Sequence, residues 1–214
     1  MALLAGSDSP AVAFAMFKFR RAEPADIDGA LSALGDAFAQ DPLMHYFFSE
    51  HPKGVRAGVV EFFSMLLRAR LALEMPAYVL QHGNDVRGAV MGNNTSRLPW
   101  PPSLADEWGQ FETYVPGFAA RLAAYENICE AHQPEEDHYY VGVIGVHPSL
   151  QGNGAGKTML DAFCALSQAD SKSRGVYLDT ANPHSLQFYY ANGFERRGEG
   201  SLDGLPLWCV YKPT

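Results

Sequence analysis

The glycines between His147 and Leu160 (HPSLQGNGAGKTML) have the spacing of a loop that holds phosphate oxygens. Glycine lets the main chain approach an oxygen because it has no Cβ, and the free N–H groups at the start of a following helix favour a negative charge. A nucleotide-binding P-loop would need glycine where Gln151 stands, and a dinucleotide-binding loop would need glycine where Lys157 stands. Both of these loop types therefore miss by one residue.

A third loop pattern, Gln/Arg-x-x-Gly-x-Gly/Ala, fits without adjustment and is typical of proteins that bind the pyrophosphate of coenzyme A. A second run, ANPHSLQFYYANGFERRGEG over residues 181–200, follows the segment GVYLDT. Together the two runs resemble the GNAT superfamily of acyl-CoA-dependent N-acetyltransferases. The matching positions are Val146, Pro148, Gln151, Gly154 and Gly156 in the first motif, and Asn182, Ser185, Phe188, Tyr189, Gly193 and Phe194 in the second.

The resemblance covers residues 138–212 in detail and the earlier part of the chain only in architecture. Within the superfamily the sequence looks closest to the puromycin N-acetyltransferase-like group. That placement depends on the segments IGVHP at 144–148, LDT at 178–180 and LWCVYKP near the end of the sequence, together with the segments RLAAYEN and AHQPEE.

The resemblance implies where acetyl-CoA, the expected cosubstrate, binds. Its pantetheine arm would lie between two splayed strands, its pyrophosphate on a row of backbone N–H groups, and its sulfur near Tyr189. Lys157 would either contact a phosphate or face solvent. The implied cofactor-binding residues are Ile144, Gly145, Val146, Gln151, Gly152, Asn153, Gly154, Ala155, Gly156, Lys157, Asn182, Ser185 and Tyr189.

Acetyl transfer needs a neutral amine, a donor for the developing oxyanion and a proton for the departing thiolate. A phenol with a pKa near 10 can protonate a thiolate whose thiol has a pKa nearer 8.5, so Tyr189 is the expected general acid. Tyr190 is its rival, although consecutive helical residues point about 100° apart. Asp179 either helps to deprotonate the amine or is structural, and Glu126 is a second candidate base. A backbone N–H near Val146 is the expected oxyanion donor.

The composition of the 214 residues is that of an ordinary globular protein, with 47% hydrophobic and 19% charged residues. The formal net charge of −8 argues against a nucleic-acid partner, and no stretch approaches the ~20 apolar residues of a membrane span. The three cysteines are widely spaced, which predicts a reducing, cytoplasmic location. The seven histidines show no metal-ligand spacing, so no metal is expected.

The order of predicted elements describes an α/β fold. Strands are predicted at 17–21, on either side of a turn at 83–85, and at 138–146, 175–180, 194–200 and 207–212, and helices at 24–38, 56–73, 116–130, 154–168 and 183–192. The aromatic run 42–50 is core or pocket wall, and the prolines near 99–102 mark a loop. The resemblance implies a GNAT fold, with a mixed, mostly antiparallel sheet whose central parallel strands splay apart. Residues 1–16 are an expected flexible start, 17–214 one domain, and about 93–137 an insert beside the substrate.

The sequence therefore predicts an acetyl-CoA-dependent N-acetyltransferase that acts on the primary amine of a small molecule by direct attack in a ternary complex. Three alternatives stay open: an acetyltransferase of a peptide or protein amine, a non-catalytic acyl-CoA sensor, and a P-loop nucleotide hydrolase. The insert discriminates between the first two acceptors, because a walled pocket indicates a small molecule and an open groove a polypeptide. Both a monomer and a homodimer are compatible with the sequence.

Overall fold

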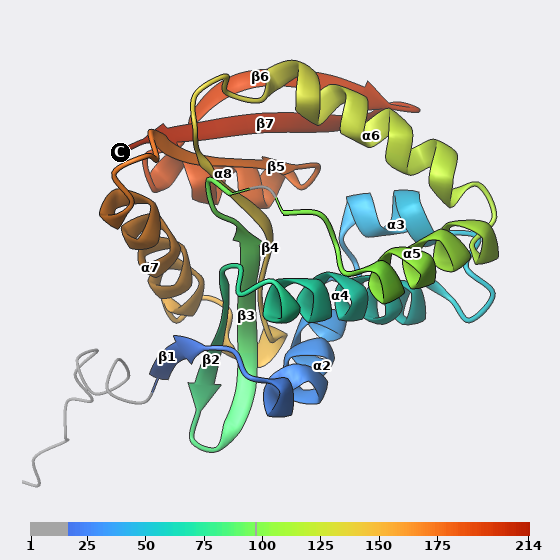
Figure 1. The fold of residues 1–214 in the computed structure, drawn as a ribbon, viewed down its shortest axis with the longest axis horizontal. Helices are drawn as coiled ribbons and strands as arrows, with labels where there is room; N and C mark the ends of the chain where they lie inside the picture. The colour runs from blue at the N-terminus through green and yellow to red at the C-terminus, as the bar shows by residue number, and fades with distance from the viewer. Residues whose placement is uncertain (1–16, 97) are drawn as a thin grey trace, which may run out of the picture.

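A computed structural model describes residues 17–96 and 98–214 of the chain (Figure 1). The expectation of a flexible start at 1–16 lies outside these residues. The elements are β1 (Phe17–Arg21), η1 (Pro24–Asp26), α2 (Ile27–Ala37), α3 (Pro42–Phe48), α4 (Val55–Ala72), β2 (Ala77–His82), β3 (Asp85–Asn93), α5 (Pro102–Tyr114), α6 (Phe118–His132), β4 (Tyr139–Val146), η2 (Pro148–Leu150), α7 (Ala155–Ala169), β5 (Gly175–Thr180), α8 (Pro183–Ala191), β6 (Glu195–Leu202) and β7 (Leu205–Pro213).

The strands form one seven-stranded sheet in the order β1-β2-β3-β4-β5-β7-β6. Neighbouring strands are antiparallel except β4 and β5, which are parallel. A parallel pair needs a crossover connection, and α7 supplies it between β4 and β5. The predicted α/β class with a mixed, mostly antiparallel sheet is confirmed.

The parallel pair at the centre of the sheet separates soon after it forms. Only two residues of β4, Tyr139 and Tyr140, pair with β5, opposite Val176 and Tyr177. On its other edge β4 stays paired with β3 as far as Val146, and β5 is paired with β7 along its whole length. Figure 1 shows the two strands diverging. The predicted splay is therefore confirmed, and it leaves 141–146 without a strand partner toward β5 among the described residues.

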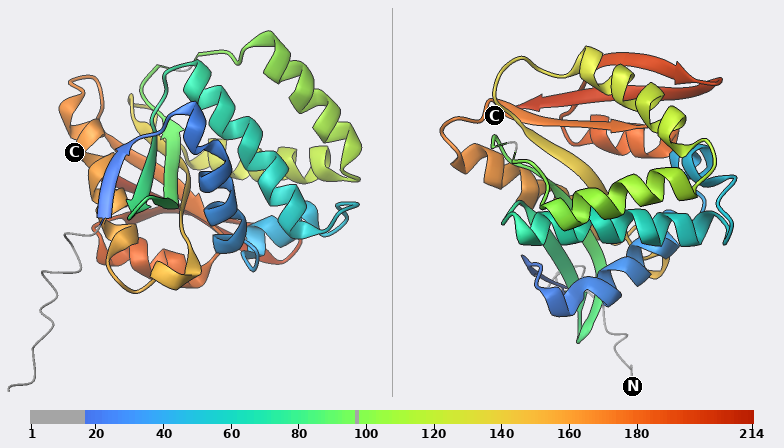
Figure 2. Two further views of the ribbon diagram at one scale, coloured as in Figure 1. Left: turned by 90° about the horizontal axis from the view of Figure 1, so that it is seen from below. Right: turned by 45° about the vertical axis from the view of Figure 1, so that its right-hand side comes forward.

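Helices cover both faces of the sheet, and the alternation of side chains along the strands divides the core between them (Figure 2). In β2 and β3, Val79 and Ala89 pack in the cluster that contains α2, α3 and α4. The next residues in each strand, Leu80 and Val90, pack on the opposite face with α7 and α8. Gly145 of β4 is needed for this packing, because an added Cβ would lie only 2.7 Å from the Phe38 ring.

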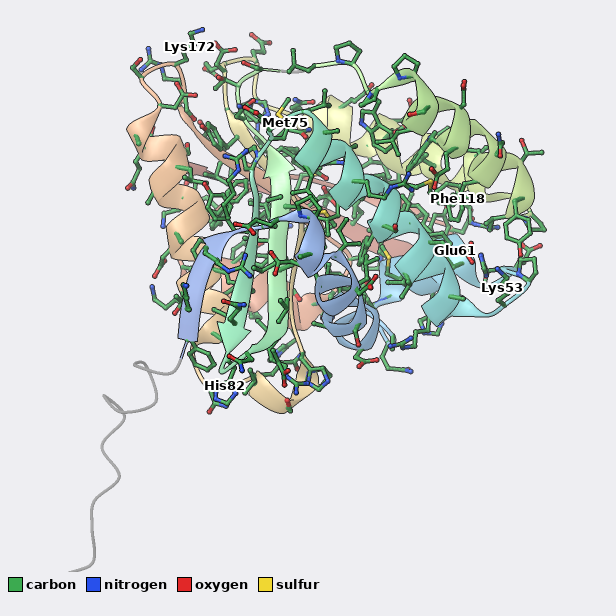
Figure 3. The ribbon with its side chains drawn as sticks, turned by 60° about the horizontal axis from the view of Figure 1, so that its bottom comes forward. Lys53, Glu61, Met75, His82, Phe118 and Lys172 are labelled. Carbon is green, nitrogen blue, oxygen red and sulfur yellow. The ribbon has the colours of Figure 1, made fainter. Side chains whose placement is uncertain are left out.

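An aromatic cluster joins α3, α4, α5 and α6 on the first of these faces. Phe47, Phe48, Phe62, Phe111 and Phe118 are all buried, with Phe47 and Phe118 in an edge-to-face contact at 5.7 Å between ring centroids. Phe118, labelled in Figure 3, lies at the start of α6 and is fully buried. This cluster packs α3, α4, α5 and α6 together, and these helices form a wall of the site described below.

Two of these helices were not predicted from the sequence. The sequence of the run 42–50 is compatible with core or pocket wall, and in the structure it contains α3. The Asp41 carboxylate caps the start of α3 by accepting from the N–H groups of Leu43 and Met44. The prolines near 99–102 were interpreted as a loop, yet Pro102 begins α5. Proline fits the first turn of a helix because the missing N–H would have no partner there. The insert therefore holds two helices instead of one.

Candidate active site

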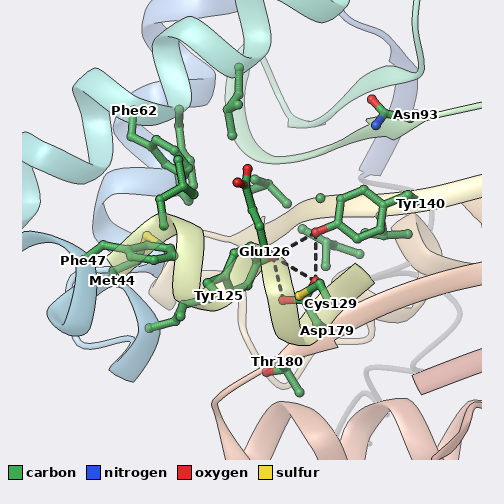
Figure 4. A pocket seen from close by; sticks show the side chains of 18 of the residues that line it. Met44, Phe47, Phe62, Asn93, Tyr125, Glu126, Cys129, Tyr140, Asp179 and Thr180 are labelled. Carbon is green, nitrogen blue, oxygen red and sulfur yellow. Dashed lines mark hydrogen bonds between the residues drawn. The ribbon is translucent and has the colours of Figure 1, made fainter. Parts of the chain in front are cut away.

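A cavity of about 580 Å³ opens at the point where β4 leaves β5. Residues 140–144 of β4 and the end of β5 form one side, α8 closes one end, and α3, α4, α5 and α6 form the rest of the wall. Figure 4 shows aromatic side chains, among them Phe47 and Phe62, on the helical side and polar groups near the strands. A concave, largely apolar site with a few convergent polar groups is the usual form of a small-molecule pocket.

Tyr189, the predicted general acid, lies on the wall of this cavity. Its ring is 7% exposed and packs against Phe188 and Phe194 at centroid distances of 5.5 and 5.7 Å. Its hydroxyl makes no hydrogen bond with any residue of 17–96 or 98–214. Burial raises the pKa of Tyr189 well above its usual value, and the nearby Asp179 and Asp41 carboxylates add to this shift. The phenol is therefore neutral at physiological pH and free to donate.

The rival tyrosine points elsewhere. The Tyr190 hydroxyl accepts a hydrogen bond of 3.3 Å from Arg196 Nε and does not line the cavity. Successive helical residues diverge by about 100°, so only one of the two adjacent tyrosines can face the site. The geometry favours Tyr189 over Tyr190.

Asp179, at the end of β5, is joined to two tyrosines from different elements (Figure 4). The Tyr125 hydroxyl of α6 lies 2.8 and 2.9 Å from the two carboxylate oxygens, and the Tyr140 hydroxyl of β4 donates to Oδ2 at 2.8 Å. The two hydroxyls are also 3.0 Å apart. The two phenol hydrogens are thus shared among four short oxygen–oxygen contacts, so the cluster can accept one further proton.

Enclosure by the protein raises the pKa of the Asp179 carboxyl, and the hydrogen bonds from Tyr140 and Tyr125 oppose that shift. Part of its surface still faces the cavity. A carboxylate with a raised pKa is a better proton acceptor than an ordinary surface aspartate. The position and the raised pKa of Asp179 are compatible with either of the two roles predicted for it, orientation of an amine or removal of its proton.

Glu126, the second candidate base, lies on α6 beside Tyr125 and also lines the cavity. Its side chain is exposed. Partial burial raises the pKa of the Glu126 carboxyl, and the Glu130 and Glu112 carboxylates raise it further. The structure therefore brings all three predicted catalytic side chains, from α6, β5 and α8, to one cavity.

The predicted phosphate loop has an open main chain. Gly152 and Gly154 adopt φ values of 78° and 79°, a region that favours glycine, and α7 begins directly afterwards at Ala155. A Cβ added at Gly152 would meet nothing within 4 Å, and one at Gly156 would come no closer than 3.8 Å to another atom. The main chain of the loop is therefore open enough to admit an anion at the start of α7, as the glycine spacing predicts.

Side chains of this loop already have partners within the protein. Gln151 Nε2 donates to the Val146 carbonyl at 3.1 Å, which ties the loop to the end of β4. The Lys157 ammonium forms an ion pair with Asp161 one turn later. The loop's affinity for an anion would thus come from its backbone N–H groups, and a phosphate contact by Lys157 stays a prediction.

Three further predicted cofactor residues lie on the two sides of the gap between β4 and β5: Asn182 and Ser185 at the start of α8, and Ile144 in β4. Asn182 caps α8, because its Oδ1 accepts from the N–H groups of His184 and Ser185 at 3.0 and 3.4 Å. Ser185 and Ile144 line the cavity. The capping role gives Asn182 a structural function whether or not it also contacts the pantetheine arm.

Several polar groups of the cavity were missed by sequence reasoning: Arg70, Tyr125, Tyr140 and Asp41. For Arg70 a signal existed, because it continues the helical spacing of Phe63, Leu66 and Leu67 and so falls on the buried side of α4. The tyrosines had no such signal, since their meeting with Asp179 depends on three separate elements.

Within the described residues, no cluster of three or more His, Cys, Asp or Glu side chains could hold a metal ion. No helix in the described ranges has both the length and the apolar character needed to cross a bilayer. The three cysteines, Cys129, Cys164 and Cys209, are free thiols.

The model of the acetyltransferase (GNAT) family matches residues 76–194. This match spans more than half of the chain, and the protein therefore belongs to the GNAT family of acetyltransferases. Members of this family use acetyl-CoA as their cosubstrate. The predicted superfamily is thus confirmed.

Solved structures with the same fold include a protein described as histone acetyltransferase HPA2 and related acetyltransferase from Corynebacterium glutamicum, which is 20% identical, with a TM-score of 0.66 over 92% of this chain and 96% of that one. An agmatine N-acetyltransferase is 16% identical, with a TM-score of 0.64 over 93% and 100%. The polyamine N-acetyltransferase of Drosophila melanogaster is also 16% identical, with a TM-score of 0.63 over 92% and 100%. At these identities the similarity establishes the fold.

Proposed function

We propose that this GNAT protein transfers an acetyl group from acetyl-CoA to the primary amine of a small molecule, by direct attack within a ternary complex. One observation carries the proposal: the gap between β4 and β5 opens into the cavity that holds Tyr189, Asp179 and Glu126. The unpaired edge of β4 can bind an extended ligand, and the cavity beside it can receive the amine.

Acetyl-CoA would supply the activated acetyl thioester. Backbone N–H groups of residues 151–156 would hold its pyrophosphate, because Gly152 and Gly156 leave the main chain open. Ile144 and Val146, with Gly145 between them, would bind the pantetheine arm on the β4 edge that lacks a partner, and Asn182 and Ser185 would face it from α8.

In this mechanism Asp179 accepts a proton from the incoming ammonium, since its cluster with Tyr125 and Tyr140 has room for one more. Tyr189 donates its proton to the departing sulfur and regains one from the nitrogen of the new amide. Among the described residues, none accepts a hydrogen bond from the Tyr189 hydroxyl. A backbone N–H near Val146 stabilises the developing oxyanion. Most of the acceleration then comes from holding the two reactants in position.

A small acceptor is favoured because α5 and α6 complete a walled cavity of about 580 Å³. The acceptors named for two proteins of the same fold, agmatine and polyamines, are small amines as well. The accessible Tyr189 hydroxyl speaks against a non-catalytic sensor. We extend the proposal to one domain over 17–214, membership of the puromycin N-acetyltransferase-like group and a cytoplasmic location, with monomer and homodimer both open.

The test is release of free thiol from acetyl-CoA in the presence of a panel of small amines and of peptides. Turnover with small amines is expected. Turnover with peptides alone would support the polypeptide alternative, and tight acetyl-CoA binding by calorimetry without any turnover would support the sensor. Binding and hydrolysis of ATP or GTP instead of acetyl-CoA would overturn the proposal in favour of a P-loop enzyme.

A further inference from the structure

Arg70 of α4 is a buried cation on the cavity wall without an acidic partner. The residue is 9% exposed, Nη1 donates weakly to the Leu66 carbonyl at 3.3 Å, and Nε has no hydrogen-bond partner in the described part of the chain. Arg70 forms no ion pair with residues 17–96 or 98–214. In contrast, Arg20 meets the buried Asp26 through two hydrogen bonds of 2.6 Å.

Burial of an uncompensated guanidinium is costly, because it loses hydration without gaining a counter-charge. Burial lowers the pKa of Arg70 to about 10, so the group is still charged at neutral pH. A protein tolerates such a group most readily where an anionic ligand completes it. Arginine suits that role, since its planar fork matches a carboxylate with two parallel hydrogen bonds.

The guanidinium lies on the Gly142 side of the cavity, near Tyr140 of the Asp179 cluster. An ideal Cβ built on Gly142 would be 3.8 Å from Arg70 Nη2 and 3.3 Å from the Tyr140 ring. Gly142 follows Tyr140, the last residue of β4 paired with β5, by two positions. The Tyr140 hydroxyl in turn donates to Asp179. The cavity therefore presents a cation and a carboxylate that both adjoin Tyr140.

We infer that Arg70 binds a carboxylate carried by the acceptor, so that the substrates are zwitterionic amines of the amino-acid class. The acceptor's ammonium then faces Asp179 while its carboxylate meets Arg70, and the aromatic wall that includes Phe62 and Trp108 receives an apolar side chain. This inference rests on the proposed function and narrows its substrate class.

The carboxylate is assigned to the acceptor rather than to the acyl chain because of the surroundings of Arg70. Arg70 also lines a side cavity of about 100 Å³ with Asn93, Leu98 and Trp100, which belong to the start of the insert. None of the predicted phosphate-loop residues 151–156 lines either cavity. The guanidinium thus faces the acceptor end of the site.

The experiment compares matched acceptors with acetyl-CoA: phenylalanine, methionine and lysine, each beside its carboxamide and its decarboxylated amine. Because the amine pKa of the amide is lower and that of the decarboxylated amine higher than the parent's, the two analogues bracket any effect of amine basicity. The wild-type protein should prefer at least one carboxylate by about 10–100-fold in kcat/KM, the range expected for a charge-assisted hydrogen-bond pair. Succinyl-CoA tested against acetyl-CoA provides the arm for a carboxylate on the acyl chain.

Arg70→Met should abolish this preference and leave the decarboxylated amines within about threefold, since a buried ion can be replaced by an apolar side chain without loss of folding. Arg70→Lys should retain part of the preference, mainly through KM. Thermal unfolding and acetyl-CoA binding by calorimetry verify that both variants are folded and bind the cosubstrate.

Three results would overturn the inference and leave the acetyltransferase proposal intact. The wild type could turn over carboxylates and their analogues equally, or Arg70→Met could keep the preference unchanged. The protein could also prefer succinyl-CoA in a way that requires Arg70. If no amine is turned over, calorimetric titration of the same amino acids with coenzyme A present decides the matter. Binding that Arg70→Met loses would support the carboxylate site although the proposed function had failed, and no binding would overturn it.

Discussion

Removal of a single oxygen atom tests the proposed chemistry most directly. Tyr189→Phe keeps the ring, which packs against Phe188 and Phe194, and deletes the hydroxyl. Because that hydroxyl has no hydrogen-bond partner among the described residues, its loss leaves no buried group unsatisfied. The free energy of unfolding should therefore change by less than about 0.5 kcal/mol, below the usual contribution of one hydrogen bond.

The effect on turnover should be far larger. A lost acid–base group lowers kcat by about 10²–10⁴-fold, which corresponds to a rise of about 2.7–5.4 kcal/mol in the activation free energy. KM for acetyl-CoA should stay within a few-fold, since the ring still fills its place. Burial raises the pKa of Tyr189, so we also expect the wild-type kcat to show no alkaline decline from this phenol below pH ~10.

The assay is thiol release under saturating acetyl-CoA, with urea unfolding of both proteins in parallel. Tyr190→Phe is the matched control, because it removes an equivalent oxygen one residue away whose hydrogen-bond partner among the described residues is Arg196 at the surface. The control should keep wild-type kcat. A near-normal kcat in Tyr189→Phe, or an equal loss in both variants, would show that the departing sulfur obtains its proton elsewhere.

Three further outcomes are expected. Asp179→Asn should lower kcat by about 10²–10⁴-fold and remove the decline of kcat/KM that protonation of Asp179 is expected to cause as the pH falls. Because the pKa of Asp179 is higher in the folded protein than the value near 3.9 in the unfolded chain, its ionisation lowers the stability of the folded protein at neutral pH. Urea unfolding at neutral pH should therefore find the variant at least as stable as the wild type. Gly156→Leu should weaken acetyl-CoA binding in calorimetry while Gly109→Leu, at another helical glycine with open surroundings, should not; equal binding would remove the loop from the site. Phe47→Ala should cost about 3–5 kcal/mol in urea unfolding and lower activity, because its buried ring contacts Tyr125 edge to face; a loss below ~1 kcal/mol would show that the aromatic wall is not rigid.

Local sequence was sufficient to single out the glycine loop and Tyr189, the residues proposed to contact the cosubstrate. Gly152 and Gly154 require unusual backbone angles, and Tyr189 stands at a fixed spacing from a turn glycine, Gly193, so these features are visible in a short window of sequence. Asp179 was also a candidate, because it is a carboxylate one residue before the end of a buried strand. For the same reason most strands and long helices were predicted within one or two residues of their observed bounds.

The polar groups on the other side of the cavity could not be predicted in the same way. The hydrogen bonds of Tyr125 and Tyr140 to Asp179 join residues 54 and 39 positions apart, and no local pattern encodes such a meeting. The start of α5 was missed because Pro102 was interpreted as a loop signal, although proline is equally suited to a first helical turn. Arg70 was overlooked because it is a charged residue at a position that its helical spacing assigns to the core.

The bond from Tyr125 to Asp179 crosses from the insert helix α6 to the central sheet. Hydrogen bonds from tyrosine hydroxyls lower the proton affinity of this carboxylate, in opposition to its burial. A variant in which α6 is replaced to admit a different amine would lose one of those donors, so the pKa of Asp179 would rise and the pH optimum of the proposed reaction would move higher. A change of acceptor that alters α6 in this protein is therefore expected to change the pH dependence of the reaction as well.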